Sequence, residues 1–490
     1  MHLIQRIAAL VSGAVLLAGI AVLPVSAEGE TESAKETFTD GMFTFAYVDD
    51  GVELCGCQTT AFSVRLPSET NGKRIVGIAD GAFYNCTTLQ SVFLSDGIRY
   101  LGKYAFAGCE SLLTLEIPDT VETIGDNAFS GCIELQSLQL PAHLTEIPEG
   151  MCYTCVSLTD VNIPDGVTKI GVEAFYDCMS LARVEIPDGV SEFGNYAFAF
   201  CSAMTEIKIP ESCTKLASGV FCGCESVTEF TVPDQMEDIG SLTFMGCTRL
   251  TDFYVEEGNV KYKAQDGVLY SPDMTTLFSY PAGNSRQSFT IPEGVTTVYD
   301  TAFFRAENLT EVSFPSTLQY VGAGAFEYCA GLKSALLPEG TLIIYENGFA
   351  DCTALHYVSL PSTLKGVGGY AFYNCPALKE ITIPASCKTV GENAFGYIEN
   401  IDADGNATPA KMEGFKEHRT SGMSVWTIVA IVIGVIVLGA VVYLLVRVIR
   451  KNQMTAEEHD ANVMADEEYE SIAEEPDENQ ETTVTNTKEE

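Results

Sequence analysis

Cysteine is the residue type in this chain with the most evident capacity for chemistry. The sequence has 17 cysteines in 490 residues, and thiols can form disulfides, ligate metal ions or attack electrophiles. Eleven of them share one register of a 23-residue period that is interrupted once: Cys86, Cys109, Cys132, Cys155, Cys178, Cys201, Cys224, Cys247, Cys329, Cys352 and Cys375. We interpret this cysteine ladder as buried free thiols, because buried cysteine behaves as a small hydrophobic residue. A disulfide ladder is the alternative, although parallel side chains on stacked coils have poor geometry for it.

Few other residues have spacings that indicate catalysis. Cys55 and Cys57 lie outside the ladder, and we expect this pair to be the most reactive. His143, His356 and His418 occur in separate contexts that match no catalytic motif. The sequence also has no phosphate-binding loop, no His-Glu-x-x-His sequence and no nucleophile elbow. Stacked repeats also cannot wrap four ligands around one metal ion. The sequence therefore predicts a protein that is not an enzyme and has no metal or cofactor.

Phenylalanine keeps the same period and indicates which elements position the cysteines. Twelve residues form this phenylalanine column: Phe83, Phe106, Phe129, Phe175, Phe198, Phe221, Phe244, Phe303, Phe326, Phe349, Phe372 and Phe395. Cys152 occupies the one position in the first run that lacks phenylalanine. A fixed period in this range is typical of a solenoid, in which each unit buries its apolar edge against its neighbours.

One repeat shows how the unit is built. Leu138 and Leu140 alternate with polar residues, as in a short strand with one buried face. Pro141 follows, and a ring that fixes φ and lacks an N–H suits a corner where the chain leaves the strand. The return leg carries a second apolar column, and glycine usually follows it, as in Ile124-Gly125.

The repeated segment Cys-x-x-Leu-x-x-Leu-x-Leu/Ile-Pro, closed by Ile-Gly-x-x-Ala-Phe-x-x-Cys, resembles the BspA-like leucine-rich repeats of microbial surface proteins. The resemblance covers roughly residues 43–398. It implies an α/β-type, β-rich, right-handed solenoid, and it implies adhesion to host or neighbouring-cell proteins. Unlike ordinary leucine-rich repeats, these have proline after the strand and cysteine before it.

Two regions depart from the period. Residues 43–70 are strand-rich and atypical, as expected of an N-terminal cap. Phe244 and Phe303 are 59 residues apart, which we interpret as one repeat plus a 36-residue insertion at about 254–290. Strands near 260–263, 268–271 and 276–280, separated by turn residues, predict a β-hairpin insertion. It is either a structural splice or a contact site for a ligand.

The chain ends predict a membrane protein. Residues 1–27 resemble a secretory signal cleaved after Ala27, and residues 425–446 are 22 residues without a charge, enough to span a bilayer. Arg447, Arg450 and Lys451 follow that segment, so the C-terminus is expected in the cytoplasm and the repeats outside the cell.

The expected organisation joins these parts in order. It comprises a signal peptide (1–27), a linker (28–42), the solenoid (43–398), a polar stalk (399–424), one transmembrane helix (425–446) and an acidic, disordered cytoplasmic tail (447–490).

Charge and surface pattern bear on partners. The net charge of −40 opposes nucleic-acid binding, which needs basic patches. Outward positions of the predicted strands are the candidate binding face for extracellular proteins or glycans: Phe93, Asp160, Arg183, Glu185, Glu206, Lys208, Glu229, Asp252, Tyr254 and Tyr357. The favoured function is a membrane-anchored surface protein that binds macromolecules. The alternative is a single-pass receptor that relays binding to cytoplasmic partners of the tail.

Overall fold

The computed structural model describes residues 35–401, 407–411 and 415–420. The expected signal peptide, transmembrane segment and acidic tail therefore lie outside the described residues. Within the described ranges every regular element is a strand, so the fold is β-rich without the helical leg that an α/β-type repeat would have. These ranges also contain no helix long and apolar enough to cross a membrane.

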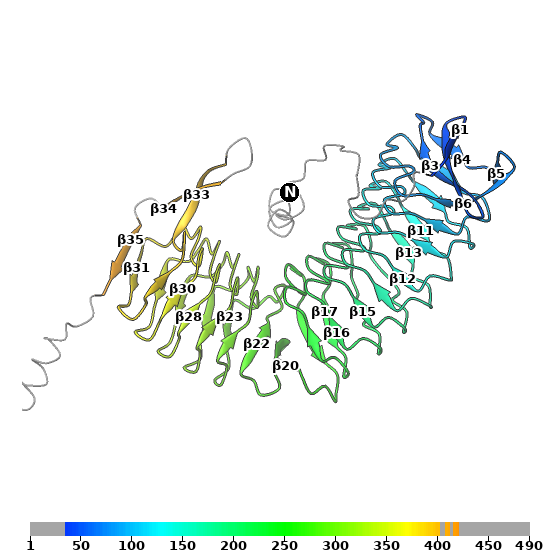
Figure 1. The fold of residues 1–490 in the computed structure, drawn as a ribbon. Helices are drawn as coiled ribbons and strands as arrows, with labels where there is room; N and C mark the ends of the chain where they lie inside the picture. The colour runs from blue at the N-terminus through cyan, green and yellow to red at the C-terminus, as the bar shows by residue number, and fades with distance from the viewer. Residues whose placement is uncertain (1–34, 402–406, 412–414, 421–490) are drawn as a thin grey trace, which may run out of the picture. The chain divides into compact units, whose positions relative to one another are not determined.

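The N-terminal strands form an antiparallel meander that joins the first coil (Figure 1). β1 (Thr37–Asp40), β2 (Phe43–Val48) and β3 (Gly51–Cys57) pair in order. β3 then pairs in parallel with β6 (Lys73–Ile78), which also pairs with the short β5 (Glu69–Thr70). The structure thus has an antiparallel element where the sequence predicts a cap, and this element covers one end of the stacked coils.

Most coils contribute to three parallel ladders of backbone hydrogen bonds. The first is the strand ladder, in which most coils contribute a short strand whose consecutive residues point outward, inward and outward. Its strands are β4 (Ser63–Arg65), β7 (Ser91–Phe93), β9 (Thr114–Glu116), β11 (Ser137–Gln139), β13 (Asp160–Asn162), β17 (Glu229–Val232), β19 (Asp252–Val255), β23 (Ser288–Thr290), β25 (Glu311–Ser313), β27 (Ser334–Leu336), β29 (Tyr357–Ser359), β31 (Glu380–Ile383) and β35 (Lys416–Arg419).

The second, the return ladder, is built on the apolar column that precedes glycine. Its strands are β6, β8 (Tyr100–Leu101), β10 (Thr123–Ile124), β12 (Glu146–Ile147), β14 (Lys169–Ile170), β15 (Glu192–Phe193), β16 (Lys215–Leu216), β18 (Asp238–Ile239), β22 (Thr276–Ser279), β24 (Thr297–Val298), β26 (Tyr320–Val321), β28 (Ile343–Ile344), β30 (Gly366–Val367) and β32 (Thr389–Val390). The glycine that follows β10 shows why a side chain is excluded there. A Cβ on Gly125 would lie 2.5 Å from the backbone N of Lys103 in the preceding coil.

The third, the loop ladder, surrounds the phenylalanine column. In a typical coil the N–H groups of Tyr104, Phe106 and Gly108 donate to carbonyls of the next coil at 3.0, 2.8 and 2.8 Å. The residues two positions before and two positions after the phenylalanine have positive φ, 56° at Tyr104 and 71° at Gly108. Glycine and asparagine recur at these two positions because they tolerate the left-handed region at low cost.

Phenylalanine rings fill the coil interior as the period predicts. Most rings of the column have no exposed surface, and successive rings stack, as Phe326 does on Phe349 with centroids 4.9 Å apart and planes 2° from parallel. The core therefore contains runs of stacked rings, interrupted at Cys152, and each coil within a run depends on both of its neighbours.

The insertion interrupts this line and revises its predicted size. The structure places β20 (Lys263–Gln265) and β21 (Val268–Tyr270) in an antiparallel meander with β22. Tyr280, 23 residues before Phe303, stacks on Phe303 at 4.9 Å and so belongs to the ring column. The 59-residue interval is thus one ordinary coil and one enlarged coil of 36 residues, rather than a repeat plus a 36-residue insertion. Because Tyr280 takes the place of phenylalanine in this coil, the phenylalanine period does not mark it.

We call the boundary between Phe244 and Tyr280 the joint. Phe244 is partly exposed and packs edge-on against Phe253 at 5.0 Å instead of stacking on Tyr280. No backbone acceptor among the described residues reaches the N–H groups of Leu242, Phe244 and Gly246, so the loop ladder is interrupted here. A cleft of about 40 Å³ opens at this point. The buried apolar residues form two large clusters that meet within β21, with Leu269 in one and Val268 and Tyr270 in the other, and a third, small cluster lies apart from them.

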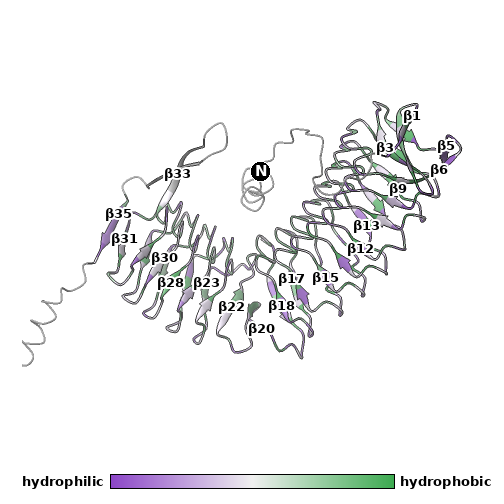
Figure 2. Ribbon diagram, viewed as in Figure 1, coloured by the Kyte–Doolittle hydropathy of each residue, from purple (hydrophilic) through white to green (hydrophobic). Residues whose placement is uncertain are grey.

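Two further regions differ from the sequence prediction. No strand forms around Val184 or Ile207, which are only half-buried, so the strand ladder is interrupted in two central coils. In the expected stalk, β33 (Gly396–Ile401) pairs with β34 (Ala407–Lys411), and the hydrophilic β35 (purple in Figure 2) pairs with β31. Phe415 stacks on Phe395 at 5.4 Å. The solenoid therefore continues past residue 398.

Candidate functional site

The predicted binding residues fall in two outward columns of the repeat. Six of them lie on strands of the strand ladder, whereas Arg183, Glu185, Glu206 and Lys208 lie in the two coils in which no strand forms. Residues 23 positions apart in successive coils are side by side, as the pairing of Glu229 with Asp252 and of Thr231 with Tyr254 shows. The first column contains Asp160, Arg183, Glu206, Glu229, Asp252 and Tyr357, and the second contains Phe93, Glu185, Lys208 and Tyr254. The repeat thus brings the central members together, whereas Phe93 and Tyr357 lie several coils away on opposite sides of them.

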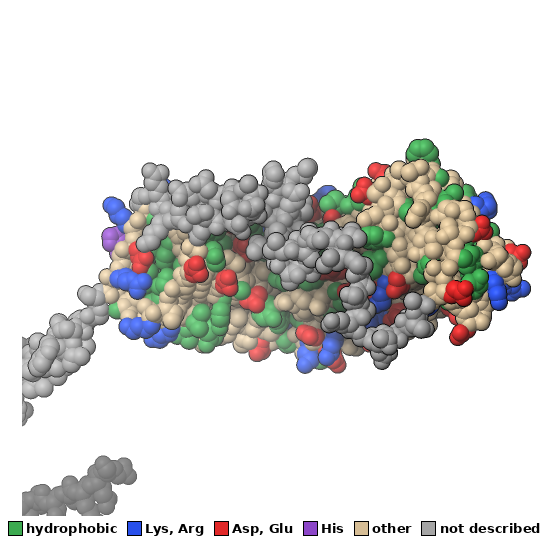
Figure 3. Space-filling view, turned by 45° about the horizontal axis from the view of Figure 1, so that its top comes forward, with side chains coloured by type: hydrophobic (Ala, Val, Ile, Leu, Met, Phe, Trp, Pro, Cys, Tyr) green, Lys and Arg blue, Asp and Glu red, His purple; other side chains and the backbone are tan. Residues whose placement is uncertain are grey.

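These side chains are available to a partner. All are exposed except Asp252, which is half-buried. The aromatic members keep 38% (Phe93), 50% (Tyr254) and 54% (Tyr357) of their surface exposed. The charged members include both acids and bases, and acidic and basic side chains also lie near one another on the surface shown in Figure 3. A face with mixed charges and isolated rings suits recognition of a polar macromolecular surface, where aromatic anchors contribute most of the affinity.

Local contacts fix some of these residues. The guanidinium of Arg65 lies 4.4 Å from the ring centre of Phe93, a cation–π contact that orients the exposed ring. Gln139 Nε2 donates to Asp160 Oδ2 at 3.1 Å. Leu336, which is 55% exposed in the second column, was missed by the sequence analysis. Its outward position in the repeat was the signal that could have identified it.

The cysteine ladder has a structural role that the sequence did not reveal. In ten coils the ladder thiol donates to the backbone carbonyl at the phenylalanine position of the preceding coil, as Cys201 does to Phe175 at 3.3 Å and Cys329 to Phe303 at 3.0 Å. All 17 cysteines are free in the structure, and the ladder members are buried, as predicted. Burial raises the pKa of the Cys201 thiol, so these side chains act as apolar hydrogen-bond donors rather than nucleophiles.

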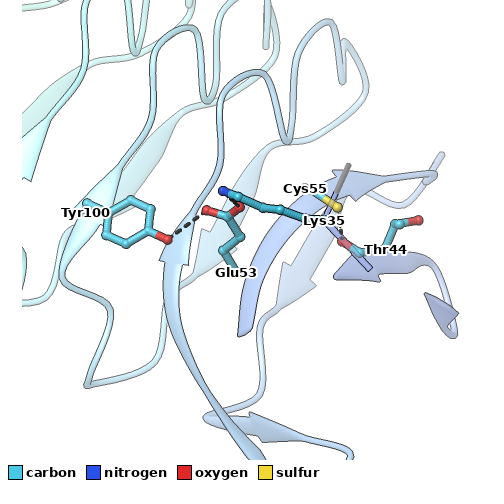
Figure 4. Close-up of polar contacts among 5 residues, drawn as sticks. All are labelled: Lys35, Thr44, Glu53, Cys55 and Tyr100. Carbon is cyan, nitrogen blue, oxygen red and sulfur yellow. Dashed lines mark hydrogen bonds and ion pairs between the residues drawn. The ribbon is translucent and has the colours of Figure 1, made fainter. Parts of the chain in front are cut away.

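The cap contains the main polar cluster of the N-terminal end (Figure 4). Glu53 is 6% exposed, and its carboxylate accepts from Lys35 Nζ at 2.8 Å and from the Tyr100 hydroxyl at 2.7 Å. Burial and the Glu53 hydrogen bond raise the pKa of Tyr100. This network ties the chain before β1 to the second coil.

Cys55 and Cys57 do not behave as the reactive pair that the sequence suggested. The Cys55 thiol donates to the Thr44 carbonyl at 3.3 Å, and burial raises its pKa. The pKa of Cys57 is also raised, chiefly by a hydrogen bond with the Cys86 thiol and then by burial. Raised thiol pKa values lower the thiolate fraction at neutral pH. Cys57 is thus a partner of the first ladder cysteine rather than of Cys55.

Two half-buried acids, Glu327 and Asp177, lie beside the phenylalanine column, away from the candidate face. Burial, with a contribution from Asp351, raises the pKa of Glu327 to about 8, and burial raises the pKa of Asp177 to about 6. Both follow phenylalanine-column residues, where neighbouring coils enclose the side chain. In the part of the chain that the structure describes, no group of His, Cys, Asp and Glu is placed to hold a metal ion.

Comparison with known proteins identifies the repeats. The family model described as BspA type leucine rich repeat region (6 copies) matches residues 61–182, 145–266 and 277–402. A leucine-rich cell surface protein of Faecalibacterium prausnitzii is 22% identical, with 80% of this chain and 100% of that chain covered and a TM-score of 0.45. A leucine-rich repeat protein of Bacteroides ovatus is also 22% identical, with 78% and 100% covered and a TM-score of 0.41.

The pneumococcal vaccine antigen PcpA is 18% identical, with 79% of this chain and 94% of that chain covered and a TM-score of 0.45. No curated protein matches the chain. The family model spans well over half of the 490 residues, and its period coincides with the ring column, the cysteine ladder and the three backbone ladders. The chain belongs to the family of proteins with BspA-type leucine-rich repeats.

Proposed function

We propose that this protein is a membrane-anchored surface protein that binds other macromolecules, proteins or glycans, through the outward face of its strand ladder. The observation that supports this most directly is a central group of exposed residues in nearby coils, four of which lie in the two coils where the strand ladder is interrupted. Glu185, Lys208 and Tyr254 belong to one column, and Arg183 and Glu206 to the other. The repeat places charges of both signs and an aromatic ring within a few coils of one another.

The core explains why this face can vary without loss of the fold. The inward residue of each strand is buried, as Phe230 and Phe253 are at 1% exposure, whereas the flanking residues make few contacts with the interior. Partner specificity in repeat proteins resides in such positions. Binding, rather than catalysis, is the activity that this arrangement supports.

A binding experiment with matched variants tests the proposal. The intact protein, solubilised in mild detergent, is used to capture components from host matrix and bacterial-surface extracts. Lys208→Ser combined with Tyr254→Ser should remove the captured component, because an exposed positive charge and an exposed ring of the same column are both lost. Tyr345→Ser is the control, since Tyr345 is 45% exposed but follows β28 of the return ladder. Equal capture by the strand-ladder variant and the wild type would contradict this binding face.

The localisation is part of the same proposal. A signal cleaved after Ala27, a span at 425–446 and the basic residues after it would place the repeats outside the cell and the tail in the cytoplasm. Protease added to intact cells should then remove the solenoid and leave a C-terminal epitope intact. Retention of the solenoid with loss of that epitope would show the opposite orientation.

A further inference from the structure

All three backbone ladders are interrupted at the joint. In the return ladder, β18 pairs only with β16, whereas β22 pairs with β21 of the hairpin and with β24. In the strand ladder, β19 pairs with β17 and β23 pairs with β25, and among the described residues no pairing joins β19 to β23. Elsewhere an interruption affects one or two ladders, and the loop ladder continues. Two arrays of coils therefore meet near β20 and β22 (Figure 1) without a shared sheet.

Hydrogen bonds that do cross the joint lie around β19. The N–H of Gly283, beyond the joint, donates to the Leu250 carbonyl at 2.8 Å. The N–H of Phe253 donates to the carbonyl of Gly267, at the tip of the hairpin, at 3.0 Å. A few separate bonds constrain two bodies less than a continuous ladder does, so these contacts can serve as a pivot.

Side chains of β21 fill the space between the two arrays. Leu269 belongs to the apolar cluster of the first array, whereas Val268 and Tyr270 belong to the cluster of the second. Leu269 also lines the cleft of about 40 Å³, which leaves room beside this strand. Apolar packing is non-directional, so a small displacement costs less here than in a hydrogen-bonded ladder. The hairpin therefore has the properties of a hinge element.

One ion pair spans the joint. Arg305 Nη1 lies 3.7 Å from Glu225 Oε1, although Glu225 belongs to the first array and Arg305 to the second. The intervening coils have Gly246 and Ala282 at the position that corresponds to Arg305, so no bulky side chain of this column stands between the partners. Both side chains are partly exposed, 23% for Arg305 and 40% for Glu225. Among the described residues, no other ion pair crosses the joint.

We propose that the joint is a hinge between the two arrays and that the Arg305–Glu225 ion pair sets its resting angle. The pair joins partly solvated charges, so it can open and close reversibly, and its strength depends on ionic strength. Tyr254 of β19 and Tyr357 of β29 lie on opposite sides of the joint, so bending changes the spacing of these exposed rings. The hinge itself does not depend on the proposed binding function.

Single-molecule energy transfer in the full-length, detergent-solubilised protein tests the proposal. The two dyes are attached to unnatural amino acids in place of Glu116 of β9 and Glu311 of β25, which are exposed and lie in different arrays. The distribution of transfer efficiency should shift when sodium chloride is raised to about 0.5 M, because the ion pair is screened. Arg305→Gln should show that shift at low salt and no further shift at high salt. The ratio of the closed to the open arrangement should change by about 2- to 5-fold, as for one exposed ion pair.

Two controls separate the hinge from other effects. Glu307→Gln removes the other carboxylate that Arg305 contacts, at 3.1 Å, but Glu307 lies in the same array, so the distribution should stay as in the wild type. Dyes at Glu116 and Thr231 both lie in the first array and should report no change in any variant or at either salt concentration. The proposal would be overturned if salt left the wild type unshifted, if Arg305→Gln matched the wild type at low salt, or if either control shifted equally.

Discussion

Glu327 should make the stability of the solenoid depend on pH in an unusual direction. It follows Phe326 in the ring column, and the same position of the neighbouring coils holds Phe304 and Ala350, which are 5% and 1% exposed. This surrounding, together with Asp351, raises the pKa of Glu327 to about 8. In the unfolded chain the same carboxyl has an ordinary value near 4.3. The folded protein thus holds a proton that the unfolded chain has already lost at neutral pH.

The sign follows from this difference in bound protons. Below about pH 4.3 both states are protonated, and the buried neutral carboxyl is compatible with the fold. As the pH rises to about 8, the unfolded state is increasingly favoured by ionisation, and above that value the loss is complete. One pKa unit corresponds to about 1.4 kcal/mol, so the total loss in unfolding free energy is about 4–5 kcal/mol.

Urea unfolding of wild type and Glu327→Gln at pH 5 and pH 8.5 measures this loss. The variant keeps the size of the side chain but has no proton to lose, so it should be the more stable protein at the higher pH. The difference between the two proteins should grow by several kcal/mol between the two pH values. Glu311→Gln, at an exposed position of β25, is the control and should follow the wild type. A Glu327→Gln profile parallel to that of the wild type would refute the reasoning.

Four further substitutions and a thiol titration test the core. Phe198→Ala should cost about 3–5 kcal/mol in urea unfolding, because it empties a fully buried site between rings at 5.1 and 6.1 Å. Phe395→Ala should cost less, because Phe395 keeps 8% of its surface exposed although a ring lies on each side of it. Equal costs at the two positions would show that enclosure of the ring does not set the cost. Cys201→Ala should lower the unfolding free energy by about 1–2 kcal/mol, because a hydrogen bond and packing contacts are lost, and Cys201→Ser should restore part of that loss. No change in stability in either variant would show that the hydrogen bond from the thiol to Phe175 contributes little. Thiol titration of the reduced protein should find few groups before denaturation and more than ten after it; a similar number in both states would contradict burial of the ladder.

The period of the sequence predicted the coils because one chemical requirement recurs in each of them. A ring must fill the interior, so Phe198 and its equivalents mark every coil that uses phenylalanine. Tyr280 meets the same requirement with a different ring, and its coil was therefore mistaken for part of an insertion. The apolar residues around Val184 fit the strand pattern, yet no strand forms there. Pattern alone does not report whether neighbouring backbones approach closely enough to pair.

The C-terminal end was harder to predict for a related reason. Phe415 follows Phe395 by 20 residues rather than 23, and the hydrophilic strand that pairs with β31 has no apolar alternation. The candidate face was predicted more directly, because alternation along a strand distinguishes outward from inward residues. The Cys57–Cys86 neighbourhood could not be predicted, since it depends on how an irregular cap meets the first coil.

The joint affects how the molecule unfolds. In a one-dimensional array, cooperativity passes from repeat to repeat through interface energies, and a weak interface divides the array into separate folding units. At the joint the ring column and the loop ladder are both interrupted, and the apolar core divides into its two large clusters. Under a denaturant gradient or a pulling force we therefore expect two transitions, one for the coils before Phe244 and one for those from Tyr280 onward. Unfolding of one half of the array would then stop at the enlarged coil that contains the hairpin, and the other half would keep its structure.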